Sequence, residues 1–141
     1  MTKKARVKWA GDMTFVGESP SGHAVVMDSG SAEGGLDHGI RPMEMLLLGT
    51  GGCSAIDVML MLKKSRQKVT DCWVELESER APEPPRVFTK IHMHFVVTGQ
   101  NIDPRHVERA IKLSHEKYCS ASVQVGALAQ ITSDFEIRET S

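Results

Sequence analysis

Apolar and polar residues alternate along the first part of the chain, with turn signals between the alternating stretches. Residues 5–10, 13–18 and 23–27 each show this period of two, which is typical of half-buried strands. Gly11-Asp12 and Ser19-Pro20-Ser21-Gly22 separate the three stretches, and both are typical of tight turns. The pattern therefore predicts a three-stranded meander.

A long apolar segment follows a loop rich in glycine, serine and aspartate at residues 28–40. Pro42 suits the first position of a helix, and apolar side chains occupy almost every face from Met43 to Leu62. A helix that is apolar all round is buried, either in a core or at a subunit contact. The glycines from Gly49 to Gly52 predict a break within it.

The following stretches alternate again and predict two long strands, at residues 69–78 and 87–98, paired antiparallel across a proline-rich turn at residues 81–85. Asp103 is suited to cap the next helix and Pro104 to occupy its first position. The apolar face of that helix is formed by Val107, Ala110, Ile111, Ser114 and His115.

A short helix near residues 123–129 and a last strand at residues 131–138 complete the predicted order. Strands and helices are mixed without a βαβ repeat, so the fold class is α+β with a mainly antiparallel sheet and a buried central helix. With 141 residues and neither internal repeat nor low-complexity segment, the chain is expected to form a single domain over residues 1–141.

Charge and composition restrict the partners. The formal net charge is -1 and 40% of the residues are hydrophobic, so no electrostatic feature favours nucleic acid or an anionic membrane. The polar, basic start of the chain is unlike a secretory signal. Glu44 and Asp57 make the long apolar segment a poor membrane span. We therefore expect a cytoplasmic protein with no nucleic-acid or membrane partner.

Three cysteines, Cys53, Cys72 and Cys119, are the candidates for chemistry. An odd number of thiols in a reducing compartment argues against a disulfide framework. Free cysteine is also among the most buried residue types, so inert buried thiols remain open as an interpretation. Cys72 alternates within a predicted strand and is interpreted as structural.

The surroundings of the other two thiols differ. A helix that restarts after the glycines would favour a thiolate at Cys53, whereas Asp57, one helical turn later, would oppose it. Cys119 follows a segment carrying Lys112, His115 and Lys117, whose positive charge would lower its pKa. His115 and Cys119 could also form a Cys/His nucleophile pair, although no oxyanion-hole motif accompanies them.

His92 and His94 alternate on a predicted strand and share one face. Such a pair can bind zinc, but no third ligand follows at a suitable spacing. A polar sheet face opposite Ile91, Met93 and Phe95 is the favoured interpretation. We therefore expect neither a metal nor a cofactor.

Three segments resemble the signature segments of the OsmC/Ohr family, most closely its YhfA-like branch. They are Pro42-Met43-Glu44-Met45-Leu46, Gly51-Gly52-Cys53-Ser54-Ala55 and Tyr118-Cys119-Ser120. The resemblance extends over nearly the whole chain. It implies an OsmC-like fold, an intertwined homodimer with sites at the subunit interface, and thiol-dependent reduction of organic hydroperoxides.

The resemblance also implies roles for single residues. Cys53 matches the peroxidatic cysteine, which becomes a sulfenic acid, and Cys119 matches the resolving cysteine, which closes a disulfide. A small dithiol or a lipoylated protein would then reduce the pair. Glu44 is a candidate third catalytic residue, displaced by one position because Met43 stands where the family has its glutamate.

Two departures from the family pattern keep other hypotheses open. On a continuous helix Glu44 and Cys53 would lie on opposite faces, so Glu44 needs the break at the glycines to approach the thiol. No arginine lies between Met13 and Met27, where the family has its activating arginine. The alternative is a non-catalytic OsmC-fold protein that binds a small apolar ligand or a partner at the dimer interface. A third hypothesis is a sulfur-handling enzyme that uses Cys53 on another electrophile.

Overall fold

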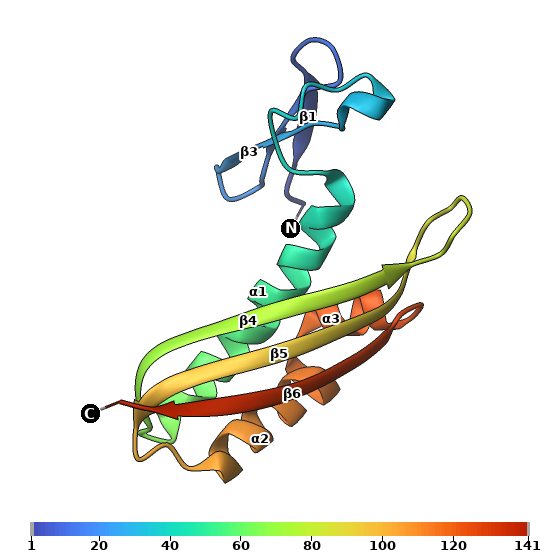
Figure 1. Cartoon of the computed structure of the whole chain (residues 1–141). Helices are drawn as coiled ribbons and strands as arrows, with labels where there is room; N and C mark the ends of the chain where they lie inside the picture. Colours follow the sequence, from blue (N-terminus) through green and yellow to red (C-terminus); the bar gives the residue numbers. More distant parts are fainter. Residues whose placement is uncertain (1, 141) are drawn as a thin grey trace. The chain divides into compact units, whose positions relative to one another are not determined.

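The computed structural model describes residues 2–140 (Figure 1). Its contacts divide the chain into two compact units, one reaching Leu46 and the other starting at Leu47. The single-domain organisation over residues 1–141 stays a prediction. The elements are β1 (Arg6–Trp9), β2 (Phe15–Glu18), β3 (Ala24–Met27), η1 (Ser31–Glu33), α1 (Pro42–Lys64), β4 (Lys68–Arg80), β5 (Phe88–Gln100), α2 (Pro104–Leu113), η2 (Ser114–Tyr118), α3 (Ser120–Gly126) and β6 (Gln130–Glu139).

The N-terminal unit is built on the predicted meander. Strands β1, β2 and β3 lie in chain order and pair antiparallel. The loop after β3 is tied down by Asp28, whose buried carboxylate accepts hydrogen bonds from the Thr14 hydroxyl and from the backbone N–H groups of Ser29 and His38. A buried carboxylate needs hydrogen-bond partners, so these contacts fix the conformation of the loop around Asp28.

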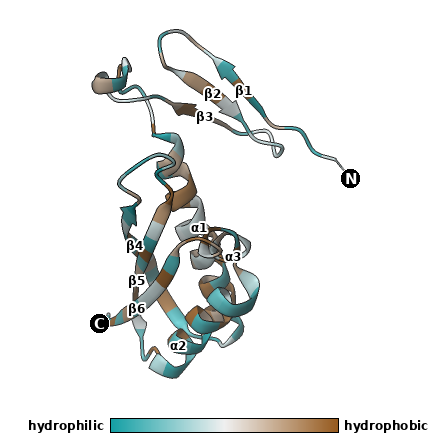
Figure 2. Cartoon of the chain, turned by 90° about the vertical axis from the view of Figure 1, so that its right-hand side faces the viewer, coloured by the Kyte–Doolittle hydropathy of each residue, from teal (hydrophilic) through white to brown (hydrophobic). Residues whose placement is uncertain are grey.

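The C-terminal unit is a three-stranded sheet with its helices on one face (Figures 1 and 2). β4 and β5 pair antiparallel, as predicted. β6 instead pairs parallel with β5, because the chain crosses over through α2, η2 and α3 before it returns to the sheet. The sheet pairing is thus mainly antiparallel, with one parallel edge that alternation alone could not predict.

The core of this unit lies between the inner face of the sheet and the helices. Asp103 caps α2 by accepting the backbone N–H of Arg105, and Pro104 is the first helical residue, as predicted. Its predicted apolar face is buried at Val107, Ala110, Ile111 and Ser114. The largest fully buried apolar side chains from the sheet and α1 are Val58, Leu62, Ile91, Met93, Phe95, Val96 and Val97.

Helix α1 is continuous, so the predicted break between Gly49 and Gly52 is wrong. Gly51 serves close packing instead: a Cβ on this residue would lie 2.7 Å from Cδ1 of Leu76 on β4 and 3.4 Å from Cγ1 of Val74. The glycine therefore brings the helix backbone against the sheet without interrupting the helix.

Within the single chain α1 is buried on one face only, and burial of its other faces at a subunit contact stays a prediction. Its buried side is one stripe formed by Thr50, Gly51, Ser54, Val58 and Leu62. Ile56 is 64% exposed and Leu60 54% exposed in the single chain. By length and composition alone α1 could cross a membrane, but the buried stripe packs on the sheet as a core helix does.

Candidate functional site

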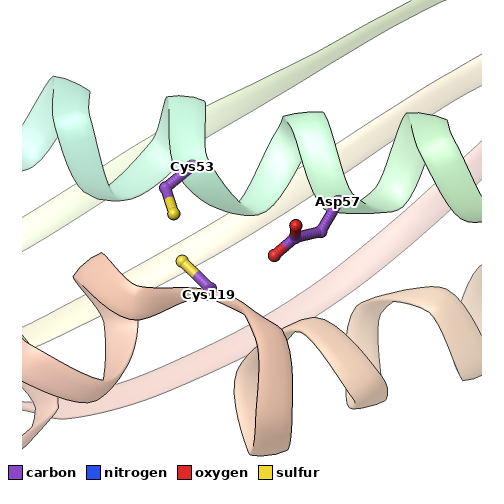
Figure 3. Close-up of side chains that lie close together, drawn as sticks. All are labelled: Cys53, Asp57 and Cys119. Carbon is purple, nitrogen blue, oxygen red and sulfur yellow. The ribbon is translucent and has the colours of Figure 1, made fainter.

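The fold brings together the two cysteines that the sequence singled out. Cys53 lies on α1, and Cys119 lies between η2 and α3. Sγ of Cys53, Sγ of Cys119 and a carboxylate oxygen of Asp57 all lie within 4.8 Å of one another. The two sulfur atoms point toward each other from opposite elements (Figure 3). The chain thus forms a Cys–Cys–Asp cluster of residues distant in sequence.

Cys119 is held in place by the local backbone. The chain leaves α2 through the π-helical turn η2, and the N–H of Cys119 donates to the Ser114 carbonyl at 2.8 Å. Cys119 then caps α3, its sulfur accepting the N–H of Ser122 at 3.3 Å. Its thiol lies 4.0 Å from the Thr50 carbonyl oxygen on α1. π-helical turns are frequent at functional sites, and this one directs the sulfur toward α1.

Burial raises the pKa of the Cys119 thiol. The N–H and side chain of Ser122 act in the opposite direction, while neighbouring Cys53 raises the pKa further. Cys119 has no exposed surface, whereas Cys53 is half-buried. The expectation that Lys112, His115 and Lys117 lower the pKa of Cys119 is therefore wrong, because burial dominates and none of the three is among the groups that shift this pKa.

Asp57 is oriented by a chain of buried hydroxyl groups that the sequence did not suggest. The Ser114 hydroxyl lies 3.0 Å from Oδ2 of Asp57 and 3.1 Å from the Ser54 hydroxyl. A carboxylate only accepts hydrogen bonds, so Ser114 donates to Asp57 and receives the hydrogen of Ser54. In the sequence, the one sign of this role was Ser114, a polar residue on the mainly apolar face of the predicted helix.

Glu44 makes a local contact at the start of α1, and its catalytic role stays a prediction. Its Oε1 accepts the backbone N–H of Arg41 at 2.8 Å, a capping contact at the start of α1. Because α1 is continuous, the break that would have let Glu44 approach Cys53 is absent. The nearby arginines are also engaged, Arg41 with Asp37 at 2.7 Å and Arg6 with Glu18 at 2.7 Å.

The Cys/His pair suggested by His115 is not formed. The sulfur of Cys119 contacts Ser122, Thr50 and Cys53. Nε2 of His115 is buried without a hydrogen-bond partner among residues 2–140, and burial lowers the pKa of this histidine. Cys72 lies outside the cluster on β4, where burial raises the pKa of its thiol.

His92 and His94 line the outer face of the sheet, opposite the buried Ile91, Met93 and Phe95, as predicted. His94 makes contacts of 2.7 Å to Asp134 and 2.9 Å to Glu136 on β6, and His92 lies 3.0 Å from the same Asp134 oxygen. The carboxylates missing from the local sequence are thus supplied by the neighbouring strand. Both nitrogens of His94 are engaged by them, which agrees with a polar sheet face.

Comparison with known proteins identifies relatives of this chain. The model of the OsmC-like protein family matches residues 34–133. Protein YhfA of Escherichia coli strain K12 is 49% identical over 134 residues, covering 95% of this chain and 97% of that protein.

Solved structures share the fold over almost the whole chain. One from structural genomics is 47% identical, covers 97% of this chain and 99% of its own, and superimposes with a TM-score of 0.88. An organic hydroperoxide resistance protein OsmC from Legionella pneumophila is 16% identical with a TM-score of 0.71, over 96% of this chain and 97% of its own. At that identity, the second likeness concerns the fold alone.

Proposed function

The chain belongs to the OsmC-like protein family, and from this premise we propose that it reduces organic hydroperoxides with Cys53 as the peroxidatic and Cys119 as the resolving cysteine. The observation that carries the proposal is the approach of the two sulfur atoms to within 4.8 Å. The Legionella pneumophila protein of the same fold is named an organic hydroperoxide resistance protein.

The reaction takes place in two steps. The Cys53 thiolate attacks the outer oxygen of a hydroperoxide, the O–O bond breaks, and the departing alkoxide takes up a proton to leave as an alcohol. Cys53 is then a sulfenic acid. The Cys119 sulfur attacks the Cys53 sulfur, the S–O bond breaks, and the thiol proton leaves with the hydroxide as water. The cysteine pair is oxidised by two electrons and the hydroperoxide is reduced by two.

The different burial of the two cysteines suits this order of events. Half-buried Cys53 is open to a substrate, whereas Cys119 has no exposed surface. Cys119 is therefore protected from direct oxidation until its neighbour has reacted. A disulfide needs an S–S distance of about 2.05 Å, so the two sulfur atoms must approach further when the bond forms.

A small dithiol or a lipoylated protein is the proposed reductant, since thiol exchange at the more accessible sulfur returns both cysteines to the reduced state. We also assign the protein to the cytoplasm, where such dithiols are available. The proposed assembly is a homodimer, supported by the exposed apolar side chains Leu48, Ile56 and Leu60 on the free side of α1.

The second candidate function is non-catalytic binding of a small apolar ligand. An apolar groove in the N-terminal unit favours it, lined among others by Val7, Met13, Phe15 and Met27. This candidate predicts thiols that stay reduced in the presence of hydroperoxide.

Intact mass spectrometry of the reduced protein, before and after one equivalent of an organic hydroperoxide, tests the proposal. We expect a loss of two hydrogens that maps to a Cys53–Cys119 disulfide, with Cys72 still open to alkylation. An unchanged mass with all thiols alkylatable would contradict peroxidase function and favour the binding protein.

Single variants separate the two roles. Cys53→Ser is expected to reduce peroxide consumption to the rate without protein. Cys119→Ser should consume one equivalent and stop at a sulfenic acid that dimedone traps. Cys72→Ser is the matched control and should keep full turnover. Unchanged turnover in Cys53→Ser would exclude Cys53 as the peroxidatic residue.

A further inference from the structure

The cluster of Cys53, Asp57 and Cys119 has a geometry that reaches beyond a redox pair. Its three donor atoms lie within 4.8 Å of one another. In a tetrahedral zinc site with metal–sulfur bonds of 2.3 Å, the ligand atoms are separated by about 3.8 Å. The cluster therefore has to contract by no more than about 1 Å to become a three-ligand site. Among residues 2–140 it is the one cluster of His, Cys, Asp or Glu that meets this proximity.

The surroundings of the donors resemble the outer shell of a metal site. Metal-binding carboxylates are themselves held by hydrogen bonds, which fix their direction. Oδ2 of Asp57 accepts the hydrogen of Ser114, which is backed by Ser54, and both serines have no exposed surface. Among residues 2–140, the other carboxylate oxygen of Asp57 accepts no hydrogen bond. On the opposite side, the N–H of Ser122 holds the sulfur of Cys119.

Asp57 places a carboxylate beside the two thiols. Within the part of the chain that the structure describes, no lysine or arginine forms an ion pair with Asp57. A divalent cation would compensate both the carboxylate and the thiolates at once.

We infer that the reduced protein binds one thiophilic divalent cation of the zinc type through Cys53, Cys119 and Asp57. Two thiolates and one carboxylate are ligands that Zn²⁺ accepts, and the fourth position stays open to water or a small ligand. Cys53 and Asp57 are half-buried and accessible to an ion, whereas Cys119 is buried.

Binding of the cation and closure of the disulfide exclude each other, because both use the same two sulfur atoms. The cation would therefore keep the thiols reduced, and the oxidised chain would have no site. This inference does not rest on the proposed peroxidase activity, since it concerns the reduced protein in the absence of any hydroperoxide.

Titration of the reduced, tag-free protein with Co²⁺ under anaerobic conditions tests the inference. The Cys72→Ser variant serves as the parent, so that only the two cluster thiols remain. We expect one Co²⁺ per chain, with thiolate-to-metal charge-transfer absorption and the visible bands of tetrahedral Co²⁺, and displacement by one equivalent of Zn²⁺. Absence of saturable one-to-one binding overturns the inference, whatever the mass-spectrometric experiment with hydroperoxide gives.

Variants distinguish the three-ligand site from a simple dithiol chelate. Cys53→Ser and Cys119→Ser should each lose most of the charge-transfer signal. Asp57→Asn keeps an oxygen for Ser114 but loses the charge, and should bind at least about ten-fold more weakly; Ser114→Ala should weaken binding by about 10–100-fold. Asp57→Asn with the affinity of the parent, and with the circular dichroism of the folded protein, would overturn the role of Asp57.

Two controls complete the design. The double variant His92→Gln/His94→Gln removes the half-buried histidine pair of β5, which also offers nitrogen ligands to Co²⁺, and should bind like the parent. Parent protein oxidised with diamide to the disulfide should bind none. Retained binding by the oxidised chain, or lost binding without the histidines, would place the cation elsewhere and overturn the inference.

Discussion

Cys53 and Cys119 are the same residue type with opposite exposure, and the difference arises from the elements that carry them. Cys53 lies beside the buried stripe of α1 and keeps part of its surface. Cys119 lies at the junction of η2 and α3, where Ser122 and Thr50 enclose its sulfur. Reactivity of a thiol depends on both pKa and access, so Cys53 is the residue that an external molecule meets first.

Gly51 and Gly52 are neighbours with opposite surroundings, which gives a matched prediction. At Gly51 a Cβ would already lie 2.7 Å from Leu76, whereas at Gly52 it would meet no atom within 4 Å. Gly51→Val should lower the free energy of unfolding by about 1–3 kcal/mol through overpacking. Gly52→Val should change it by no more than about 0.5 kcal/mol.

Urea unfolding of both variants, followed by circular dichroism, measures the difference. Equal effects at the two positions would mean that α1 does not press on β4 through Gly51. A larger loss of stability at Gly51 would confirm that α1 packs closely on β4 two residues before Cys53.

At the scale of elements, the short turn η2 and the helical crossover to β6 set the positions of the cluster and of the sheet edge. η2 ends α2 with a π-helical turn and carries Ser114 and Cys119 toward α1. The crossover through these helices also makes β6 parallel to β5. The same segment therefore builds both the cluster and the sheet edge.

The pairing of β5 and β6 on the outer face predicts a dependence of stability on pH. Hydrogen bonds, first to Glu136 and then to Asp134, raise the pKa of His94. The pKa of Asp134 is lowered chiefly by its hydrogen bond with His94. The pKa of Glu136 is lowered chiefly by its hydrogen bond with Arg138. Glu75 of β4 lies in register on the other side of His94. These groups surround the imidazole with negative charge.

A raised pKa in the folded state means that the His94 contribution is complete below the unfolded value of about 6.5 and is lost as pH rises through the folded value. The carboxylates contribute above their unfolded values of about 4 and lose their contribution in acid. Destabilisation by His94→Gln should thus be greatest near pH 6 and should shrink by pH 9. Urea unfolding of both proteins at the two pH values measures this.

Glu136→Gln removes the first partner of His94 and is the matched variant. It should reduce the pH dependence of the His94→Gln effect when the two substitutions are combined. Destabilisation by His94→Gln that is the same at pH 6 and pH 9 would contradict the imidazolium assigned to this position.

At the scale of the whole molecule, the free side of α1 predicts the state of assembly. Ile56 and Leu60 are more than half exposed in the single chain, and exposed apolar side chains on one helix face mark contact surfaces. We expect light scattering after size exclusion to give twice the 15.5 kDa mass of one chain. Ile56→Glu should reduce the mass to that of one chain, because a carboxylate would be buried unpaired at the contact.

Lys112→Glu on the exposed side of α2 is the control for added negative charge, and it should leave the mass unchanged. A single-chain mass for the unmodified protein would contradict the homodimer. The proposed peroxidase chemistry would then have to be complete within one chain.

Much of the fold follows from local pattern, because alternation and capping are properties of neighbouring residues. The strands of the meander, the pair β4 and β5, and the start of α2 at Asp103 are at or near their predicted positions. The predicted break at the glycines was wrong, since only the sheet shows that Gly51 is there for contact. Within one chain the sheet covers one stripe of α1, and burial of the other faces at a subunit contact stays a prediction.

The sequence by itself determined the element order, the α+β class, the family resemblance and the choice of Cys53 and Cys119. Only the tertiary structure decided that these thiols meet, that Asp57 joins them, and that Glu44 caps a helix. The physical reason is that helix and strand periods act between near neighbours. The approach of two sulfur atoms and the burial that raises the pKa of Cys119 depend on segments that only folding brings together.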